Sequence, residues 1–200
     1  MKIYFICEKS LNESQGADAY DSEGNKLSVH QAEQFKNSKV RDKNGNLMVV
    51  FKRTKSDVST FNPGSVGEFF SDVPLEDTYF GSHVGRFYLN IRNPLVVDAQ
   101  GDDWSYPLWC FLTDDDGNLI DRSEIGNAIK NNKTGIPESV WEYIYDDDEE
   151  YEFDSLALLI RNHNLPYDGV ILKNVNEGVG NKQKVTDYIV LSKEQIERVQ

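Results

Sequence analysis

The residue types that most often perform covalent chemistry are few in this chain and show no known spacing. Its two cysteines, Cys7 and Cys110, form no C-x-x-C pair, and His30, His83 and His163 lack the spacing of metal ligands. No G-x-S-x-G sequence supports a serine nucleophile, and no G-x-x-x-x-G-K-[ST] loop supports phosphate binding of the P-loop kind. The sequence therefore predicts no metal site, and a reactive site must be built from other residues.

Carboxylates are the most abundant candidates. Eight of them stand between Glu142 and Asp154 without a base. Such a run could bind a metal ion, but its density favours a solvated loop or a frayed helix end. The turn 114–118 is also acidic, yet its glycine follows Asp116 directly and no terminal Glu is in register, so the EF-hand calcium pattern does not fit.

Basic residues gather in one segment of an otherwise acidic chain. Between Lys36 and Lys55 there are seven Lys and Arg residues and a single acid, Asp42, whereas the whole chain has a net charge of −13. A basic strip on an acidic protein suits a compact anionic ligand, and the alternative is a set of solvated side chains around a strand. The overall charge repels phosphate backbones, so we do not expect nucleic acid as a partner.

Apolar periodicity predicts the elements that must position these residues. The predicted helices cover 28–37, 123–130, a segment that starts after 137, and 155–162. The predicted strands cover 47–51, 86–91, 94–98, 167–172 and 185–191, and segments 106–112 and 119–120 are expected to form a hairpin. Strands and helices in separate runs, without regular βαβ alternation, indicate an α+β fold built around antiparallel pairs.

Length and composition indicate one domain over residues 1–200. The chain is 38% hydrophobic and 12% aromatic, which is enough to bury a core without disulfides. Residues 1–26 are expected to be an N-terminal extension or an edge strand, with a possible strand over 2–7. No apolar stretch approaches the roughly 20 residues of a membrane span, so we expect a soluble, cytoplasmic protein.

Several short segments occur in an order that resembles the ADP-ribosyltransferase-like domains of polyvalent and MuF-type proteins of phages and mobile elements. The resemblance runs from about Asp21 to the C-terminus, and the matching segments are Leu27–Phe51, Gly67–Asp72, Tyr88–Asp98, Tyr167–Ile171, Thr186–Val190 and Glu194–Ile196. It implies a split pair of small antiparallel sheets, with peripheral helices, that clasp NAD in a cleft. It also implies a toxin-like protein that acts in the host cytosol.

The resemblance further implies which residues form the site. The superfamily has a His-Tyr-Glu triad, and Lys52 stands at the histidine position, which would contact the adenosine ribose. Tyr79 matches an aromatic position, and Asp187 stands at the position of the catalytic acid. We therefore expect Asp187, Lys52 and Tyr79 as catalytic residues. The residues expected to bind NAD are Lys52, Arg53, Thr54, Phe69, Phe70, Ser71 and Tyr79, with Phe69 in place of the tyrosine that stacks on nicotinamide.

The chemistry explains these residue types. Cleavage of the nicotinamide–ribose bond passes through an oxocarbenium-like state, so a carboxylate such as Asp187 stabilises charge that is largely absent in the ground state. Aromatic rings hold nicotinamide, and a basic residue neutralises the pyrophosphate. The expected function is transfer of ADP-ribose from NAD, without a metal, to an unidentified host or phage protein, or hydrolysis of NAD.

Simpler interpretations remain open for the same residues. Lys52 and Arg53 could end an edge strand with charge that discourages aggregation. Phe69, Phe70 and Tyr79 could pack in a core, and Asp187 could cap a turn before its strand.

Two other functions also remain open. A catalytically degenerate protein of this fold could bind a basic protein through its acidic face, above all 142–154. Alternatively, the acidic surface could mimic nucleic acid and inhibit a DNA-binding enzyme. The first alternative predicts tight capture of a partner without NAD binding, and the second predicts a duplex-like array of carboxylates.

Overall fold

The computed structural model describes residues 19–55, 63–64, 66–76, 78–114, 116–123, 125–131, 133–147, 150–178 and 182–199. The expected strand over 2–7 lies outside these residues. Helices and strands are both present, and their order is α1 (Val29–Gln34), β1 (Val50–Thr54), β2 (Glu68–Ser71), η1 (Thr78–Phe80), β3 (His83–Leu89), β4 (Pro94–Asp98), η2 (Leu108–Leu112), α2 (Ile125–Asn131), α3 (Glu138–Asp146), η3 (Phe153–Ser155), α4 (Leu156–Asn162), β5 (Gly169–Glu177), β6 (Gln183–Val190), η4 (Lys193–Gln195) and β7 (Ile196–Arg198).

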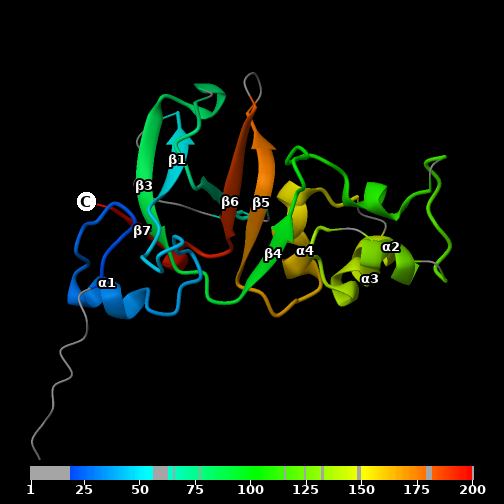
Figure 1. Cartoon of the computed structure of the whole chain (residues 1–200), viewed down its shortest axis with the longest axis horizontal. Helices are drawn as coiled ribbons and strands as arrows, with labels where there is room; N and C mark the ends of the chain where they lie inside the picture. Colours follow the sequence, from blue (N-terminus) through cyan, green and yellow to red (C-terminus); the bar gives the residue numbers. More distant parts are fainter. Residues whose placement is uncertain are drawn as a thin grey trace, which may run out of the picture.

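The seven strands form one hydrogen-bonded sheet in the order β4-β5-β6-β2-β1-β3-β7. All neighbouring pairs are antiparallel except β4 and β5, which are parallel. The expected α+β class is confirmed. The expected two small sheets are joined, because β2 pairs with β6 through Phe69 and Ile189 and with β1 through Ser71 and Phe51. Figure 1 shows β1 and β3 on one side of this junction and β4, β5 and β6 mainly on the other.

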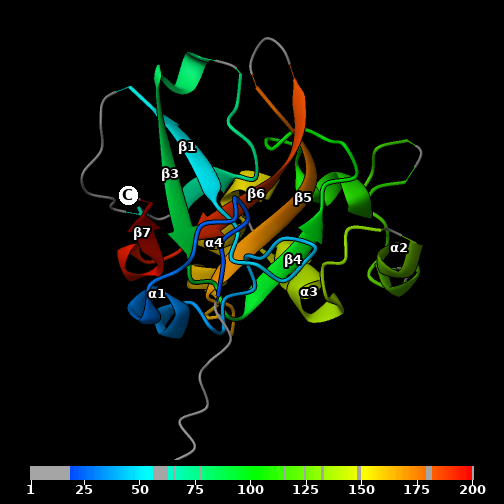
Figure 2. The ribbon, with the colours of Figure 1, turned by 60° about the vertical axis from the view of Figure 1, so that its left-hand side comes forward.

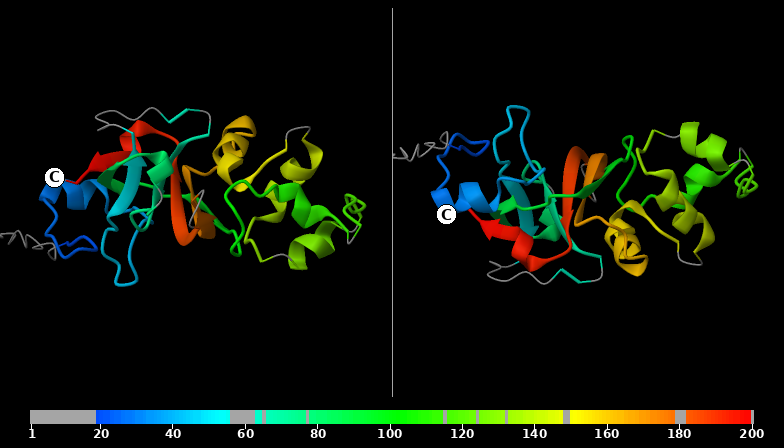
Figure 3. Two further views of the ribbon diagram at one scale, coloured as in Figure 1. Left: turned by 90° about the horizontal axis from the view of Figure 1, so that it is seen from above. Right: turned by 90° about the horizontal axis from the view of Figure 1, so that it is seen from below.

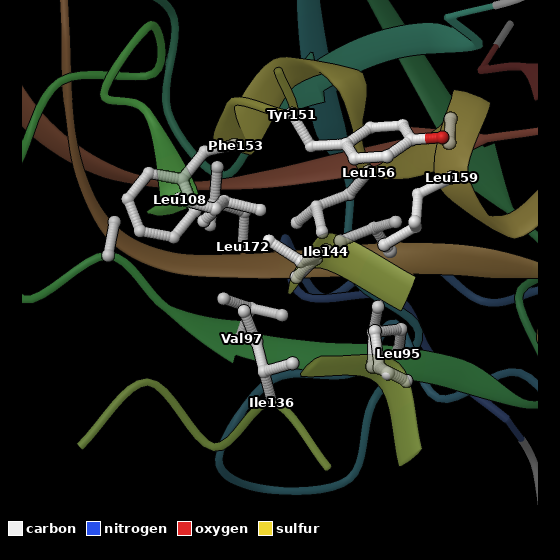
Figure 4. Close-up of a cluster of buried hydrophobic side chains, with 14 of the residues drawn as sticks. Leu95, Val97, Leu108, Ile136, Ile144, Tyr151, Phe153, Leu156, Leu159 and Leu172 are labelled. Atoms are coloured by element: carbon white, nitrogen blue, oxygen red, sulfur yellow. The ribbon is translucent and has the colours of Figure 1, made fainter. Parts of the chain in front are cut away.

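The largest core lies between the β4–β5–β6 part of the sheet and the helices α3 and α4 (Figures 1 and 3). Alternate residues of β5, Val170 and Leu172, face this core, whereas Ile171 between them belongs to a different cluster. The helices contribute Trp141 and Leu156, both fully buried. Figure 4 shows Ile144 and Leu156 of the helices close to Leu172 of the sheet. Truncation of one of them to alanine typically costs about 2 to 5 kcal/mol.

Two smaller clusters stabilise the other half of the sheet. Phe70 of β2 packs edge-on against Phe87 of β3 with ring centroids 5.3 Å apart. The third cluster joins α1 to the sheet, because Phe35 at the end of this helix packs edge-on against Tyr88 of β3 at 5.8 Å. The start of α1 follows the expected signal, since Ser28 and Gln31 form a reciprocal capping box.

The expected hairpin over 106–112 and 119–120 is wrong in its first arm. Residues Leu108–Leu112 form the 3-10 helix η2, and only Thr113 bridges to Leu119. A short, continuously apolar run fits a buried strand and a buried helix equally well. Pro107 precedes the run without a donor N–H, and Leu108 and Leu112 are both fully buried, which one helical turn permits.

Three loops of the chain share one local structure. They begin at Asp21, Asp42 and Asp114, and each has Gly three residues later and Asn four residues later. In each loop the aspartate Oδ1 accepts the backbone N–H groups of the second and fourth residues that follow it, at 2.8–3.0 Å. The Asn side chain donates to Oδ2. Each glycine has φ between 82° and 86°, a region that suits glycine.

Candidate functional site

A cleft of about 260 Å³ is lined by residues from several strands. Among these strands are β1, β5 and β6, of which β5 and β6 run side by side in Figures 1 and 2. Both halves of the sheet contribute to its walls, as do the loop before η1 and the segments that lead into η2 and α4. Its lining consists of Phe51, Lys52, Arg53, Phe69, Phe70, Ser71, Leu75, Phe80, Trp104, Asp154, Glu177 and Asp187. The cleft therefore combines aromatic rings with three carboxyl groups and two cations.

A β-bulge in β5 determines which side chains reach this cleft. Leu172 pairs with Asp187, whereas the next paired residue of β5, Val175, faces Val185, so β5 contains one extra residue. Asn174 lies in the bulge with φ of 57°, and its amide donates to Asp98 Oδ2 at 2.8 Å. Because one extra residue shifts the alternation of side chains, Glu177 lies on the same face as Asp187.

Asp187 and Glu177 form a buried carboxyl pair. Asp187 is 3% exposed and Glu177 is 8% exposed. Both side chains line the same cleft, and the neighbouring Glu177 favours the protonated form of Asp187. Burial raises the pKa of Asp187 well above its ordinary value, and the neighbouring Glu177 and Asp72 raise it further, while the charge of Lys52 lowers it. Within the described residues, no donor reaches the buried Oδ2 of Asp187.

Asp154 adds a third carboxyl group to the cleft. It lies in η3, and its backbone N–H donates to Trp104 O at 3.0 Å. Burial, together with the charges of Glu152 and Glu177, raises the pKa of Asp154 to about 6. The expectation that the acidic run 142–154 is a solvated loop or a frayed helix end is therefore wrong for Asp154.

Lys52 occupies the cleft but is bonded within the protein. Its Nζ lies 2.7 Å from Glu68 Oε1, donates to Phe69 O at 3.0 Å, and lies 5.4 Å from the centre of the Phe70 ring. Both ion-pair partners are largely buried, since each side chain is 18% exposed. These contacts fix the ammonium group at the junction of β1 and β2.

Arg53 fastens the loop that forms another wall of the cleft. Its Nε donates to Leu75 O and its Nη1 donates to Gly81 O at 3.3 Å, so one guanidinium spans both ends of the segment that contains η1. On the same segment, Gly81 has φ of 129°, and a Cβ there would lie 2.0 Å from the backbone of Thr54. The segment therefore rests directly on β1.

The structure brings most of the predicted site residues together. Asp187, Lys52, Arg53, Phe69, Phe70 and Ser71 all line the cleft. Thr54 ends β1 but is not part of the lining. Tyr79 is 66% exposed, and its ring packs edge-on against Phe80 at 5.3 Å. The aromatic residue that η1 contributes to the cleft is Phe80.

Sequence reasoning missed six residues of the lining, which are the apolar Phe51, Leu75 and Phe80 together with Glu177, Asp154 and Trp104. Glu177 lies beyond the end of the strand predicted over 167–172, but Val175 and Glu177 alternate as Val185 and Asp187 do, which is a strand signal. Asp154 was hidden in an acidic run, where its position just before an apolar helix was the only distinguishing feature. Trp104 carries no signal of this kind.

Among the described residues, no helix is long and apolar enough to cross a membrane. The described His, Cys, Asp and Glu side chains also form no group of three or more with the spacing of a metal site.

Comparison with solved structures finds a weak likeness. A chain described as the crystal structure of an anti-CRISPR protein matches with 15% identity and a TM-score of 0.33, over 76% of this chain and 95% of that chain. At this TM-score the likeness supports no argument about function. No curated protein matches the chain.

Comparison with protein families gives a direct result. The family described as ADP-ribosyltransferase in polyvalent proteins matches residues 42–200. This region contains β1 through β7 and therefore every residue that lines the cleft. The suspected resemblance is confirmed, and the chain belongs to the family of ADP-ribosyltransferases in polyvalent proteins.

Proposed function

We propose that the protein binds NAD in the cleft, cleaves the nicotinamide–ribose bond, and transfers ADP-ribose to an acceptor protein or to water. The observation that carries this proposal is the position of Asp187. It lies within the region that matches the family, it is buried and lines the cleft, and its Oδ2 has no donor among the described residues. A carboxylate held this way can stabilise positive charge that develops on a bound sugar.

The other lining residues fit parts of the same ligand. Phe69 and Phe80 offer rings for stacking on nicotinamide or adenine. Lys52 is the cation available to a phosphate, which would compete with Glu68 for its ammonium group. Arg53 donates to two backbone carbonyls, so its contribution is to hold the η1 wall in place.

The raised pKa of Asp187 makes its charge state sensitive to a bound ligand. Asp187 must lose its proton to act as a carboxylate, and burial opposes that loss. Positive charge in the cleft would favour the ionised form of Asp187, because an opposite charge lowers the pKa of a carboxyl group. Binding of NAD, which carries a cationic nicotinamide ring, would therefore move Asp187 toward its active charge state.

Titration of NAD by calorimetry, with nicotinamide release followed by chromatography, tests the proposal. The full chain should bind NAD and release nicotinamide, and Asp187→Asn should lose release by about a hundredfold or more while retaining binding. Asp146→Asn is the matched control. Asp146 is an exposed carboxylate at the end of α3 that pairs with Arg122, and it does not line the cleft. Equal release by the wild type and Asp187→Asn would contradict the role of Asp187.

A second candidate is a catalytically inactive fold that binds a basic protein through its acidic surface. The internal bonds of Lys52 and Arg53 favour it, because both cations of the cleft are already paired or hydrogen-bonded. Two residues of the acidic run 142–154 already have partners within the protein. Asp146 pairs with Arg122, and Asp147 accepts a hydrogen bond from Tyr151 and lies close to His163. Absence of NAD binding at millimolar concentration would support this candidate over the enzyme.

A further inference from the structure

From the end of β4 the chain continues along β5 as an irregular segment, residues 98–103, which we call the strap. Three backbone hydrogen bonds of 2.8 to 2.9 Å join the strap to β5, and they link Ala99 to Lys173, Gly101 to Asn174, and Asp102 to Asn176. A parallel bridge between Asp103 and Asn176 ends this pairing. The next residue, Trp104, lines the cleft, so the strap connects β5 to one wall of the cleft.

The strap and β5 depart from regular strand geometry at the same place. Asn174, in the bulge of β5, has φ of 57°, and Gln100, in the strap, has the same value. Non-glycine residues adopt this left-handed conformation at a cost, and only where their surroundings fix it. The Asp98 carboxylate fixes both residues, because its Oδ1 accepts the Gln100 N–H and its Oδ2 accepts the Asn174 amide, each at 2.8 Å. The Asn174 side chain therefore ties the two irregularities together.

Asn176 fixes the other end of the strap. Its side-chain amide donates to Gly101 O, and its backbone N–H donates to Asp102 O at 2.9 Å. Lys182 adds an ion pair with Asp103. This pair is the weaker contact, because the Lys182 side chain is 53% exposed and the Asp103 side chain is 27% exposed. The amides of the two asparagines are therefore the side-chain contacts that hold the strap most firmly to β5.

Two residues of the cleft wall depend on the strap. Trp104 follows it directly, and the Trp104 side chain packs against the largest core. The carbonyl of Trp104 accepts the backbone N–H of Asp154 at 3.0 Å, so Asp154 is held to the same segment. Glu177 ends β5, to which the strap is bonded. All three residues line the cleft, so a displacement of the strap from β5 moves Trp104 and Asp154 relative to Glu177.

We propose that Asn174 and Asn176 are positioning residues, which hold Trp104 and Asp154 in the wall of the cleft through the strap. Neither asparagine lines the cleft, so their effect must pass through the strap rather than through contact with a ligand. This role rests on the proposed function, because the wall that the strap holds is part of the NAD site.

The position of Asp187 separates the expected effect on binding from the effect on cleavage. Asp187 pairs with Leu172, which precedes the bulge, whereas the strap is bonded to β5 from Lys173 onward. Loosening of the strap therefore leaves Asp187 in place and displaces the wall beside it. We expect weaker binding of NAD with little change in the rate of cleavage once NAD is bound.

Titration of Asp154 tests the role of the two asparagines without NAD. In the wild type, carboxyl-carbon NMR of the full chain should show Asp154 titrating at its raised pKa of about 6, with its signal assigned through Asp154→Asn. In Asn176→Ala and in Asn174→Gly the midpoint should fall by about one pH unit, because a displaced strap admits water to the carboxyl group. Glu152 and Glu177, whose charges also raise this pKa, are retained in both variants.

Asn46→Ala is the matched control. The Asn46 amide donates to Asp42 Oδ2 at 3.2 Å in a loop that does not line the cleft, so this variant loses the same kind of bond away from the strap. Thermal unfolding of each variant checks that it is folded. Lys182→Ala removes only the exposed ion pair of the strap, should give a smaller shift in the same direction, and provides the test if neither asparagine variant folds. Unchanged titration of Asp154 in every folded variant would overturn the proposal.

Kinetics separate this role from the function on which it rests. If the wild type releases nicotinamide from NAD, Asn176→Ala should raise the KM for NAD by about tenfold and change kcat by less than about threefold. A fall in kcat at unchanged KM would overturn the positioning role. Release of nicotinamide with unchanged titration of Asp154 would also refute it and leave NAD cleavage standing. A lowered pKa of Asp154 in the variants, without any release of nicotinamide by the wild type, would refute the enzyme and leave the strap as the element that shapes the cleft.

Discussion

The charged side chains on the two sides of the cleft differ in their bonding partners. On the β1–β2 side, Lys52 and Arg53 are bonded to Glu68 and to backbone carbonyls, and they hold the walls in place. On the β5–β6 side, Asp187 and Glu177 are both buried without an ion-pair partner among the described residues, and burial raises the pKa of Asp187. The cations of this cleft thus stabilise structure, whereas the carboxyl groups are the ones left to meet a ligand.

The largest expected effect on stability comes from Gly81, on the structural side. Gly81→Ala would place a Cβ 2.0 Å from the backbone of Thr54 at a φ of 129°, so the η1 wall must move away from β1. We expect a loss of about 3 kcal/mol or more in the free energy of unfolding, measured by chemical denaturation.

Gly117→Ala is the matched control for this substitution. Gly117 also has positive φ, of 82°, but a Cβ there meets no atom within 4 Å. Gly117→Ala should lower the free energy of unfolding only through backbone strain, by about 1 kcal/mol. Similar losses in the two variants would show that the η1 wall does not rest firmly on β1.

Substitution of Arg53 is expected to give the second largest loss of stability. Arg53→Ala removes the donors to Leu75 O and Gly81 O, and we expect a loss of about 2 to 3 kcal/mol, because hydrogen bonds from a charged group are stronger than neutral ones. Denaturation of Arg53→Ala and Arg53→Lys would measure it, and the lysine variant should recover part of the loss. Unchanged stability with weakened NAD binding would place Arg53 among the ligand-binding residues instead.

The carboxyl groups of the cleft should make the stability of the protein depend on pH. The pKa of Asp154 is raised from 3.8 to about 6 on folding, so the folded state binds its proton more tightly than the unfolded chain does. This contribution is present below about pH 4 and is lost as the pH rises to about 6; it amounts to about 1 to 2 kcal/mol after allowance for solvent screening. Asp187 contributes with the same sign, because its pKa is also raised on folding.

Asp154→Asn isolates that contribution. Chemical denaturation at intervals between pH 4 and pH 7 should show a smaller fall in stability for the variant than for the wild type, because the asparagine does not titrate. If the free energy of unfolding changed with pH equally in the two proteins, Asp154 would not be desolvated in the cleft. The difference in bonding between the two sides of the cleft would then be smaller than the structure indicates.

Much of the fold could be predicted from local signals. The capping box at Ser28, the glycine turn after Asp42, and the alternating strands β3, β4 and β6 all lie close to the expected positions. The apolar run in η2 could not be assigned, because a short uninterrupted run has no period to distinguish helix from strand. The union of the sheet through β2 and β6 is a long-range pairing that no local pattern encodes.

The candidate site could be predicted only on its β1–β2 and β6 sides. Asp187 and Lys52 were identified through the resemblance, and both line the cleft. Glu177 reaches the cleft only because the bulge at Asn174 shifts the alternation of β5, and a one-residue irregularity is not visible in periodicity. Tyr79 and Phe80 are neighbours, so sequence spacing alone could not decide which ring turns inward.

The three Asp-x-x-Gly-Asn loops bear on how the chain folds. Each is closed by hydrogen bonds between residues no more than four positions apart, so its formation needs no distant partner and little loop-closure entropy. Such contacts form in the earliest stages of folding, before the sheet exists. Two of these loops flank the segment that carries α1, and the first buries its aspartate completely against Tyr88. Once these turns have formed, the pairings that remain to be made join strands far apart in the sequence, such as β2 with β6 and β3 with β7.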